Sequence, residues 1–119
     1  MGDETSQAKA ADALVRDILL HARDLVAQGW CQGTSAASRD GRRVDPWDPN
    51  AARWSAIGAL IAVWARWRTG GNHLAILAFQ RGNIALLAAI DDIPQTWNDA
   101  PGRTLDDVLS AFERAAQLV

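Results

Sequence analysis

The sequence has very little cysteine, histidine or lysine and contains no tyrosine. Cys31 is the single cysteine, and two histidines accompany it among 119 residues. A lone cysteine excludes a disulfide within the chain, and so few soft ligands argue against a zinc site. We therefore expect a protein of the reducing cytoplasm with no metal and no cofactor.

A long apolar run is also missing. The longest apolar stretch covers residues 57–63, whereas a helix that crosses a bilayer needs about 20 apolar residues. The first five residues include two acidic ones and lack the apolar core of a signal peptide. The sequence predicts a soluble protein with neither a membrane span nor a cleaved signal.

Neither sign of charge dominates, since 12 Lys and Arg stand against 14 Asp and Glu. A net charge of -2 provides no broad positive field to attract nucleic acid or anionic lipid. We expect neither as a partner. Arginine replaces lysine everywhere except at Lys9, and together with the many alanines this bias is typical of a bacterial genome rich in GC.

What the chain does contain is enough apolar sequence for one core. Its hydrophobic fraction is 49%, and a chain of this length fits a single domain, predicted to cover residues 1–119. Six tryptophans beside two phenylalanines make it tryptophan-rich. Such an excess favours either a well-filled core or a ligand surface.

Periodicity predicts an all-α fold, a compact bundle of four to five helices. The first helix spans residues 6–28, and Gly29 is expected to end it in a left-handed conformation. Residues 30–48 form one long loop, because turn residues interrupt every period there. Asp48 and Pro49 then predict an N-cap and first helical residue, with the second helix reaching about Arg68. The small Gly58 would let a neighbouring helix approach.

The remaining chain predicts three shorter pieces. Residues 72–90 are helical with a break or new start at Gly82 and Asn83. A short turn of helix and a tight loop follow within residues 91–103. Thr104 and Asp107 form an acidic variant of the capping box, which starts the last helix at Leu105.

Three segments resemble an uncharacterised family of small proteins from bacteria and their phages. They are Trp30-Cys31-Gln32-Gly33, the stretch Trp54–Leu60, and Trp97–Thr104, and the resemblance extends over most of the chain. In that family a cysteine usually precedes the Ala-x-Gly-Ala-Leu segment. Ser55 stands there in this sequence, which weakens any pairing of thiols with Cys31. The resemblance implies no activity.

The polar residues of two loops are the candidate site. Asp99 is a candidate general base, with Gln32 and Asn98 as hydrogen-bond donors, and Trp30 and Trp97 would exclude water so that the carboxylate pKa rises. In the structural alternative, Asn98 and Asp99 form an Asx turn, Arg103 pairs with Asp99, and both tryptophans fill the core. On this sequence evidence, Asp99 and Gln32 are the candidate catalytic residues, and the candidate ligand-binding residues are Trp30, Trp54, Trp97, Asn98 and Arg103.

Other residues carry weaker signals. Trp54, Trp64 and Trp67 would share the second helix, where they line a pocket for a flat or cationic ligand or simply belong to the core. Cys31 follows the C-terminus of a helix, whose dipole disfavours a thiolate, so we interpret it as structural. A basic patch from Arg42, Arg43, Arg66 and Arg68 would be diluted by nearby aspartates.

Three functions remain open at this level. The leading hypothesis is a binding protein that engages a small molecule or a protein through the Trp30–Gly33 and Trp97–Arg103 loops. The alternatives are a cofactor-free lyase, cyclase or hydrolase with Asp99 in a tryptophan-walled pocket, and an effector or inhibitor from a mobile element that acts by protein contact. The sequence leaves catalysis and the oligomeric state, a homo-oligomer included, undecided.

Overall fold

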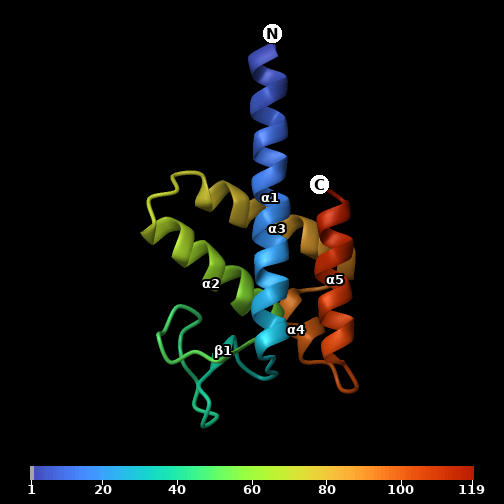
Figure 1. Cartoon of the computed structure of the whole chain (residues 1–119). Helices are drawn as coiled ribbons and strands as arrows, with labels where there is room; N and C mark the ends of the chain where they lie inside the picture. The colour runs from blue at the N-terminus through green and yellow to red at the C-terminus, as the bar shows by residue number, and fades with distance from the viewer. Residues whose placement is uncertain (1) are drawn as a thin grey trace.

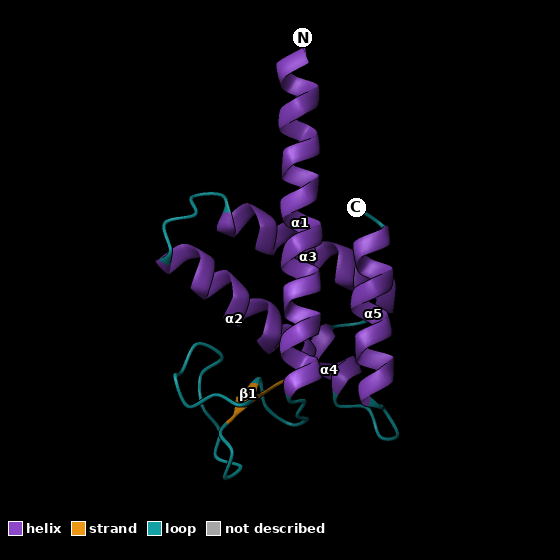
Figure 2. Cartoon of the chain, viewed as in Figure 1, coloured by secondary structure: helices purple, strands orange, loops and turns teal. Residues whose placement is uncertain are grey.

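The computed structural model describes the backbone of residues 2–119 and the side chains from residue 8 onward. It is an all-α bundle, as predicted, with one very small sheet (Figures 1 and 2). The sheet pairs β1 (Ala36–Ala37) with β2 (Arg53–Trp54) in antiparallel register. The helices are α1 (Gly2–Gln28), α2 (Ala56–Thr69), α3 (Ala75–Ile90), α4 (Pro94–Asn98) and α5 (Leu105–Gln117).

Helix α1 is the central element, and it packs against α2, α3 and α5 (Figure 1). Its apolar residues recur at steps of three and four, which places them on one side of the helix. Side chains of this stripe are fully buried, among them Ile18, Leu19, Ala22 and Val26. The N-terminal part of α1 extends beyond the other helices (Figure 1).

Gly29 follows α1 for a different reason from the one predicted. The residue does not adopt a left-handed φ, so the expected left-handed cap is wrong. A Cβ atom at this position would lie 2.1 Å from the carbonyl oxygen of Ala52. Glycine is therefore required because the segment before β2 passes directly against the end of α1.

Helix α2 begins seven residues later than Asp48 and Pro49 predicted, at Ala56. Ser55 is its N-cap and accepts a hydrogen bond from the Gly58 N–H at 3.1 Å. Asp48 instead caps a local turn, where its carboxylate accepts the Asn50 N–H at 2.7 Å. An Asp-Pro pair starts turns as readily as helices, and pairing with β1 keeps residues 53–54 extended. Trp54 consequently lies on β2 rather than on α2.

The two small residues in the helices serve close packing. Gly58 faces the backbone of Ser35, whose carbonyl oxygen lies only 1.8 Å from a built Cβ atom, so it admits a loop rather than the expected helix. Gly82 packs on α1, with Ile18 at 3.1 Å from a built Cβ. Helix α3 therefore continues through Gly82, and the predicted break there is wrong because packing outweighs the low helix propensity of glycine.

The last two helices lie where the sequence predicts, and α5 begins at Leu105 as expected. Helix α4 is the short turn expected between residues 91 and 103. Thr104 and Asp107 form the complete capping box at the start of α5, with Asp107 accepting the Thr104 N–H at 3.0 Å and Thr104 accepting the Asp107 N–H at 3.1 Å. The tight loop after α4 thus leads directly into a well-capped helix.

Candidate functional site

Hydrogen bonds at the end of helix α4 hold together the two segments that contain most of the candidate residues. The Gln32 side chain donates hydrogen bonds to the carbonyl oxygens of Asn98 at 3.0 Å and Ala100 at 3.3 Å. The Gly33 N–H donates to the Asp99 carboxylate at 2.9 Å. Segments 66 residues apart in sequence are therefore held in direct contact, and Gln32 and Asp99 are neighbours.

Asn98 is the centre of this contact and is completely buried. Its side-chain oxygen accepts hydrogen bonds from the Trp30 indole N–H at 2.9 Å and from the Ala56 N–H at 3.0 Å. Its amide group donates to the Cys31 carbonyl and to the Asp99 carboxylate, both at 3.0 Å. One side chain thus satisfies polar groups of the first loop, of α2 and of α4, as a buried amide must.

Gln95 completes the network, although the sequence analysis did not single it out. Its amide group donates to both Asp99 oxygens at 3.0 and 3.1 Å and to the Thr34 carbonyl at 3.4 Å. Its oxygen accepts the Ser55 hydroxyl at 3.0 Å. The only sequence signal was its spacing of four from Asp99, which puts both on one face of a helical turn. We call Gln95, Asn98 and Asp99 the α4 clamp.

The pKa of Asp99 is lowered rather than raised. Partial burial is the largest single influence and raises it, but hydrogen bonds from the Gly33 N–H, Asn98 and Gln95 together outweigh burial. A carboxylate that is stabilised in its charged form is a weak base. The arrangement therefore suits a structural anchor better than acid–base chemistry.

Trp97 and Arg103 form a separate pair beside the clamp. The Arg103 guanidinium lies 4.1 Å from the centre of the Trp97 ring and donates to the Trp97 carbonyl at 2.9 Å. Its ion-pair partner is Asp107 at 4.0 Å. The predicted pairing of Arg103 with Asp99 is not formed, because Asp99 already accepts hydrogen bonds from the clamp and from Gly33. Trp97 is buried, and Arg103 covers its face.

Cys31 is half-buried next to the clamp, and its thiol donates to the Thr34 carbonyl at 3.6 Å. Burial, and secondly the negative charge of Asp99, raise the pKa of this thiol to about 11, although Arg53 opposes the shift. Almost no thiolate exists near neutral pH at such a pKa. This environment agrees with a structural cysteine.

The surface hollows lie away from the clamp, along the loop that joins β1 to β2. A hollow of about 830 Å³ lies between residues 46–51 and the C-terminal half of α2. Trp47 stands at this hollow with 57% of its surface exposed, and Trp64 of α2 also lines it. We call this hollow the aromatic groove. Its remaining lining residues include Pro46, Pro49, Arg66 and Arg68.

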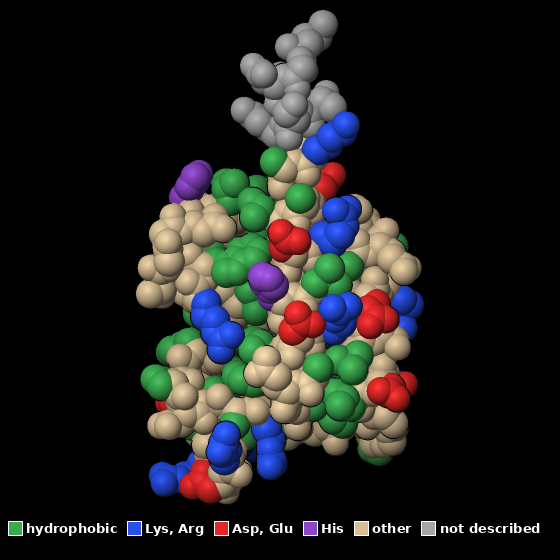
Figure 3. Space-filling view, viewed as in Figure 1, with side chains coloured by type: hydrophobic (Ala, Val, Ile, Leu, Met, Phe, Trp, Pro, Cys, Tyr) green, Lys and Arg blue, Asp and Glu red, His purple; other side chains and the backbone are tan. Residues whose placement is uncertain are grey.

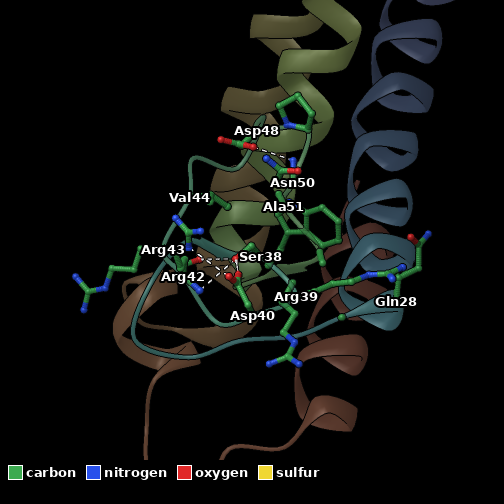
Figure 4. A pocket seen from close by; sticks show the side chains of 15 residues that line it. Gln28, Ser38, Arg39, Asp40, Arg42, Arg43, Val44, Asp48, Asn50 and Ala51 are labelled. Carbon is green, nitrogen blue, oxygen red and sulfur yellow. Dashed lines mark hydrogen bonds and ion pairs between the residues drawn. The ribbon is translucent and has the colours of Figure 1, made fainter.

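A second, open hollow of about 1010 Å³ adjoins the first and is lined by four arginines. We call it the arginine hollow, and its arginines are Arg39, Arg42, Arg43 and Arg53. Figure 4 shows Ser38, Asp40 and Arg42 joined by hydrogen bonds on the opposite side from Gln28. Asp48, Pro49 and Ala51 line both hollows, so this short segment is the wall between them.

Trp54, a predicted ligand-binding residue, lines the arginine hollow but is only 4% exposed. Its indole N–H donates to the Pro46 carbonyl at 3.1 Å. Trp54 therefore fixes the chain just before the wall segment. Neither the aromatic groove nor the arginine hollow is lined by Gln32, Asn98 or Asp99.

Charge is separated along the chain in a way that the net value conceals. Residues 39–68 contain six arginines and three aspartates, whereas the rest of the chain has six cationic and eleven acidic residues. In the space-filling view, Lys and Arg side chains lie at the lower end of the molecule and also over the rest of the face, so it is the balance of charge along the chain that differs (Figure 3). The end that carries both hollows is therefore basic within an acidic protein.

Two further features concern metals and membranes. Among the side chains from residue 8 onward, no three His, Cys, Asp or Glu residues are grouped so that they would hold a metal ion. Within residues 2–119, none of the helices combines the length and apolar character that a membrane crossing requires.

Fold and site together define a small all-α protein with an internally bonded clamp and a basic, aromatic end. Residues 10–118 match the model of a family of unknown function, DUF6197. The chain belongs to this family, which agrees with the resemblance inferred from its motifs. No curated protein and no solved structure shows significant similarity to the chain.

Proposed function

We propose that this protein is a binding protein whose ligand surface is the aromatic groove. The observation that carries the proposal is the position of Trp47, a large apolar side chain that is 57% exposed at the mouth of a hollow. Exposed aromatic residues at a concave surface, accompanied by a few polar groups, are typical of ligand sites. Arg66 and Arg68 supply such groups at the rim.

The α4 clamp supports this surface from a distance. Residues 35–54 leave the bundle and return to it, and the clamp holds both ends of that excursion. Gln95 binds Thr34 before the excursion and Ser55 after it, and Asn98 binds Ala56. The loops that the sequence suggested as the ligand surface would therefore act by positioning the wall segment, because their polar groups are already bonded to one another.

A binding role fits the chemistry of Asp99 better than catalysis does. A general base near neutral pH needs a raised pKa and access to substrate. The pKa of Asp99 is lowered, and its carboxylate accepts hydrogen bonds from three neighbouring residues. We therefore assign Gln32 and Asp99 a positioning role under this proposal.

Fluorine NMR of protein labelled with 5-fluorotryptophan tests the proposal, because the six tryptophans serve as reporters. A library of small planar and charged compounds should contain members that shift the Trp47 and Trp64 signals together and leave Trp97 unchanged. Trp47→Ala should abolish the Trp64 shift. Ile84→Ala, which removes an equally exposed apolar side chain from α3, is the matched control and should not.

Two outcomes contradict the proposal. In one, no compound of the library shifts Trp47 or Trp64. In the other, the compounds that bind shift Trp30 and Trp97 while Trp47 stays unchanged, which would return the ligand surface to the two loops joined by the clamp.

A further inference from the structure

We propose that the two adjoining hollows together bind a phosphorylated ligand with a planar ring, the chemistry of a nucleotide. The inference rests on the proposed function and extends it, because it adds the arginine hollow and names the ligand class. The ring would occupy the aromatic groove, and the phosphate would lie among the arginines across the wall formed by Asp48, Pro49 and Ala51.

The arginines of the hollow carry charge that the protein itself leaves largely uncompensated. Arg42 is paired with Asp40 at 3.2 Å. Among the side chains from residue 8 onward, no carboxylate lies within ion-pair distance of Arg39, Arg43 or Arg53. Guanidinium groups of this kind bind phosphate with two parallel hydrogen bonds.

The aspartates that line the arginine hollow cancel only part of this charge. Asp40 accepts hydrogen bonds from Ser38 and Arg42, which hold its pKa below the ordinary value and keep it paired. Asp48 accepts the Asn50 N–H, and it is the second of two aspartates in a lining that has four arginines. The hollow therefore keeps an excess of positive charge in a protein whose overall charge is negative, and this asymmetry attracts an anion to one end.

An aromatic surface lies beside the arginine hollow. Trp47 is exposed, Trp64 lines the same groove, and Arg68 lies 5.0 Å above the Trp64 ring. Tryptophan and arginine faces stack on planar rings such as nucleobases. Basic residues interleaved with aromatic ones are the pattern by which proteins hold a ring and its phosphate together.

The two hollows also lie within reach of a single ligand. The two hollows share the residues of the wall, so a ligand of modest length can reach both at once. A purely apolar ligand would leave the arginines unused, and a simple anion would leave Trp47 in water. A ligand that has both a planar ring and a phosphate contacts both surfaces. The positive charge and the exposed indole together favour such a ligand.

The experiment compares AMP, adenosine and inorganic phosphate by titration of the 5-fluorotryptophan-labelled protein at low salt. AMP should bind about tenfold more tightly than adenosine or phosphate alone. The double variant Arg39→Gln/Arg43→Gln should remove this advantage while adenosine binding persists, which also shows that the variant is folded. Trp47→Ala should weaken the binding of AMP and of adenosine to the same extent.

A matched control removes the same charge elsewhere. Arg16→Gln/Arg114→Gln lies on α1 and α5, outside both hollows, and should leave AMP affinity within about twofold. Equal weakening by the two double variants would overturn the proposal, because the attraction would then be a general effect of charge. An affinity for phosphate equal to that for AMP would overturn it too.

Two further comparisons complete the experiment. One distinguishes a free nucleotide from a nucleic-acid strand, and the other distinguishes failure of the nucleotide proposal from failure of the proposed function. ATP and a short single-stranded oligothymidylate distinguish a free nucleotide from a nucleic-acid strand, according to which binds more tightly, and either result supports recognition of phosphate with a ring. If adenosine shifts Trp47 and Trp64 but phosphate adds nothing, the nucleotide proposal falls and groove binding stands. If no compound shifts these signals, both proposals fall.

Discussion

The α4 clamp and the basic end treat their polar groups in opposite ways. In the clamp, the buried Asn98 uses both its oxygen and its amide group, and Gln95 and Asp99 are bonded to several partners each. At the basic end, Arg39 and Arg43 have no carboxylate partner among side chains 8–119, and Trp47 is exposed. The hydrogen bonds of the clamp stabilise the fold, whereas the arginines and the exposed indole of the basic end can bind another molecule.

This contrast shows why the most conspicuous polar motifs were the less informative ones for function. Residues such as Asn98 and Asp99 attract attention in a sequence because polar loops often carry chemistry. Their groups satisfy one another once the chain folds, so they specify how the loop is held. Variants of the two regions should therefore differ in kind, with clamp variants losing stability and groove variants losing binding.

The largest effect is expected for Asn98→Ala. It leaves the Trp30 indole N–H and the Ala56 N–H without their acceptor in a buried place, and each such group costs about 1–3 kcal/mol. The free energy of unfolding, measured with urea, should fall by about 3–5 kcal/mol. Asn50→Ala, at an exposed position, is the matched control, and a loss no greater than its own would contradict the role of the clamp.

Gly58→Ala should come second, with a loss of about 2–3 kcal/mol. A Cβ atom there meets the Ser35 carbonyl oxygen at 1.8 Å, so the backbone before β1 must move. Gly82→Ala is the comparison, because both glycines lie in helices but differ in their neighbours. A Cβ atom at residue 82 meets a side-chain atom of Ile18 at 3.1 Å rather than backbone, and the gain in helix propensity offsets this contact. Equal urea midpoints for the two variants would show that the loop yields easily.

Asp99→Asn should cost about 1 kcal/mol at pH 7, because hydrogen bonds to a charged acceptor are lost. The folded-state pKa of Asp99 is lowered, so its contribution is fully present above the ordinary pKa of about 4 and disappears as the pH falls through the folded value. Urea unfolding of both proteins at pH 7 and at acidic pH measures this. A difference that grows toward acidic pH would have the wrong sign.

Trp47→Ala should change stability least, by less than about 0.5 kcal/mol, since the side chain is mostly exposed. The same variant should lose the ligand-dependent shift of Trp64. Thermal unfolding with and without ligand separates the two effects. A large loss of stability would show that Trp47 is a structural residue, and it would contradict the contrast between the two regions.

Much of the fold was predictable from local signals. The stripe of α1, the end of α2 near Thr69 and the capping box of α5 depend on residues close together in sequence, and each lies where it was expected. The start of α2 was not predictable in this way, because Asp48 and Pro49 suit a turn as well as a helix. Pairing of β2 with β1 decided between them.

The sequence by itself determined the all-α class, the apolar stripe of α1 and the capping box of α5, because periodicity and capping act over a few residues. Only the tertiary structure decided that Gln95 joins Asn98 and Asp99 in one network with residues 33–34, that Trp54 is buried, and that α2 lines a hollow with residues 46–51. Those facts depend on which segments meet across the bundle. Contacts between distant segments leave no local pattern for a single sequence to reveal.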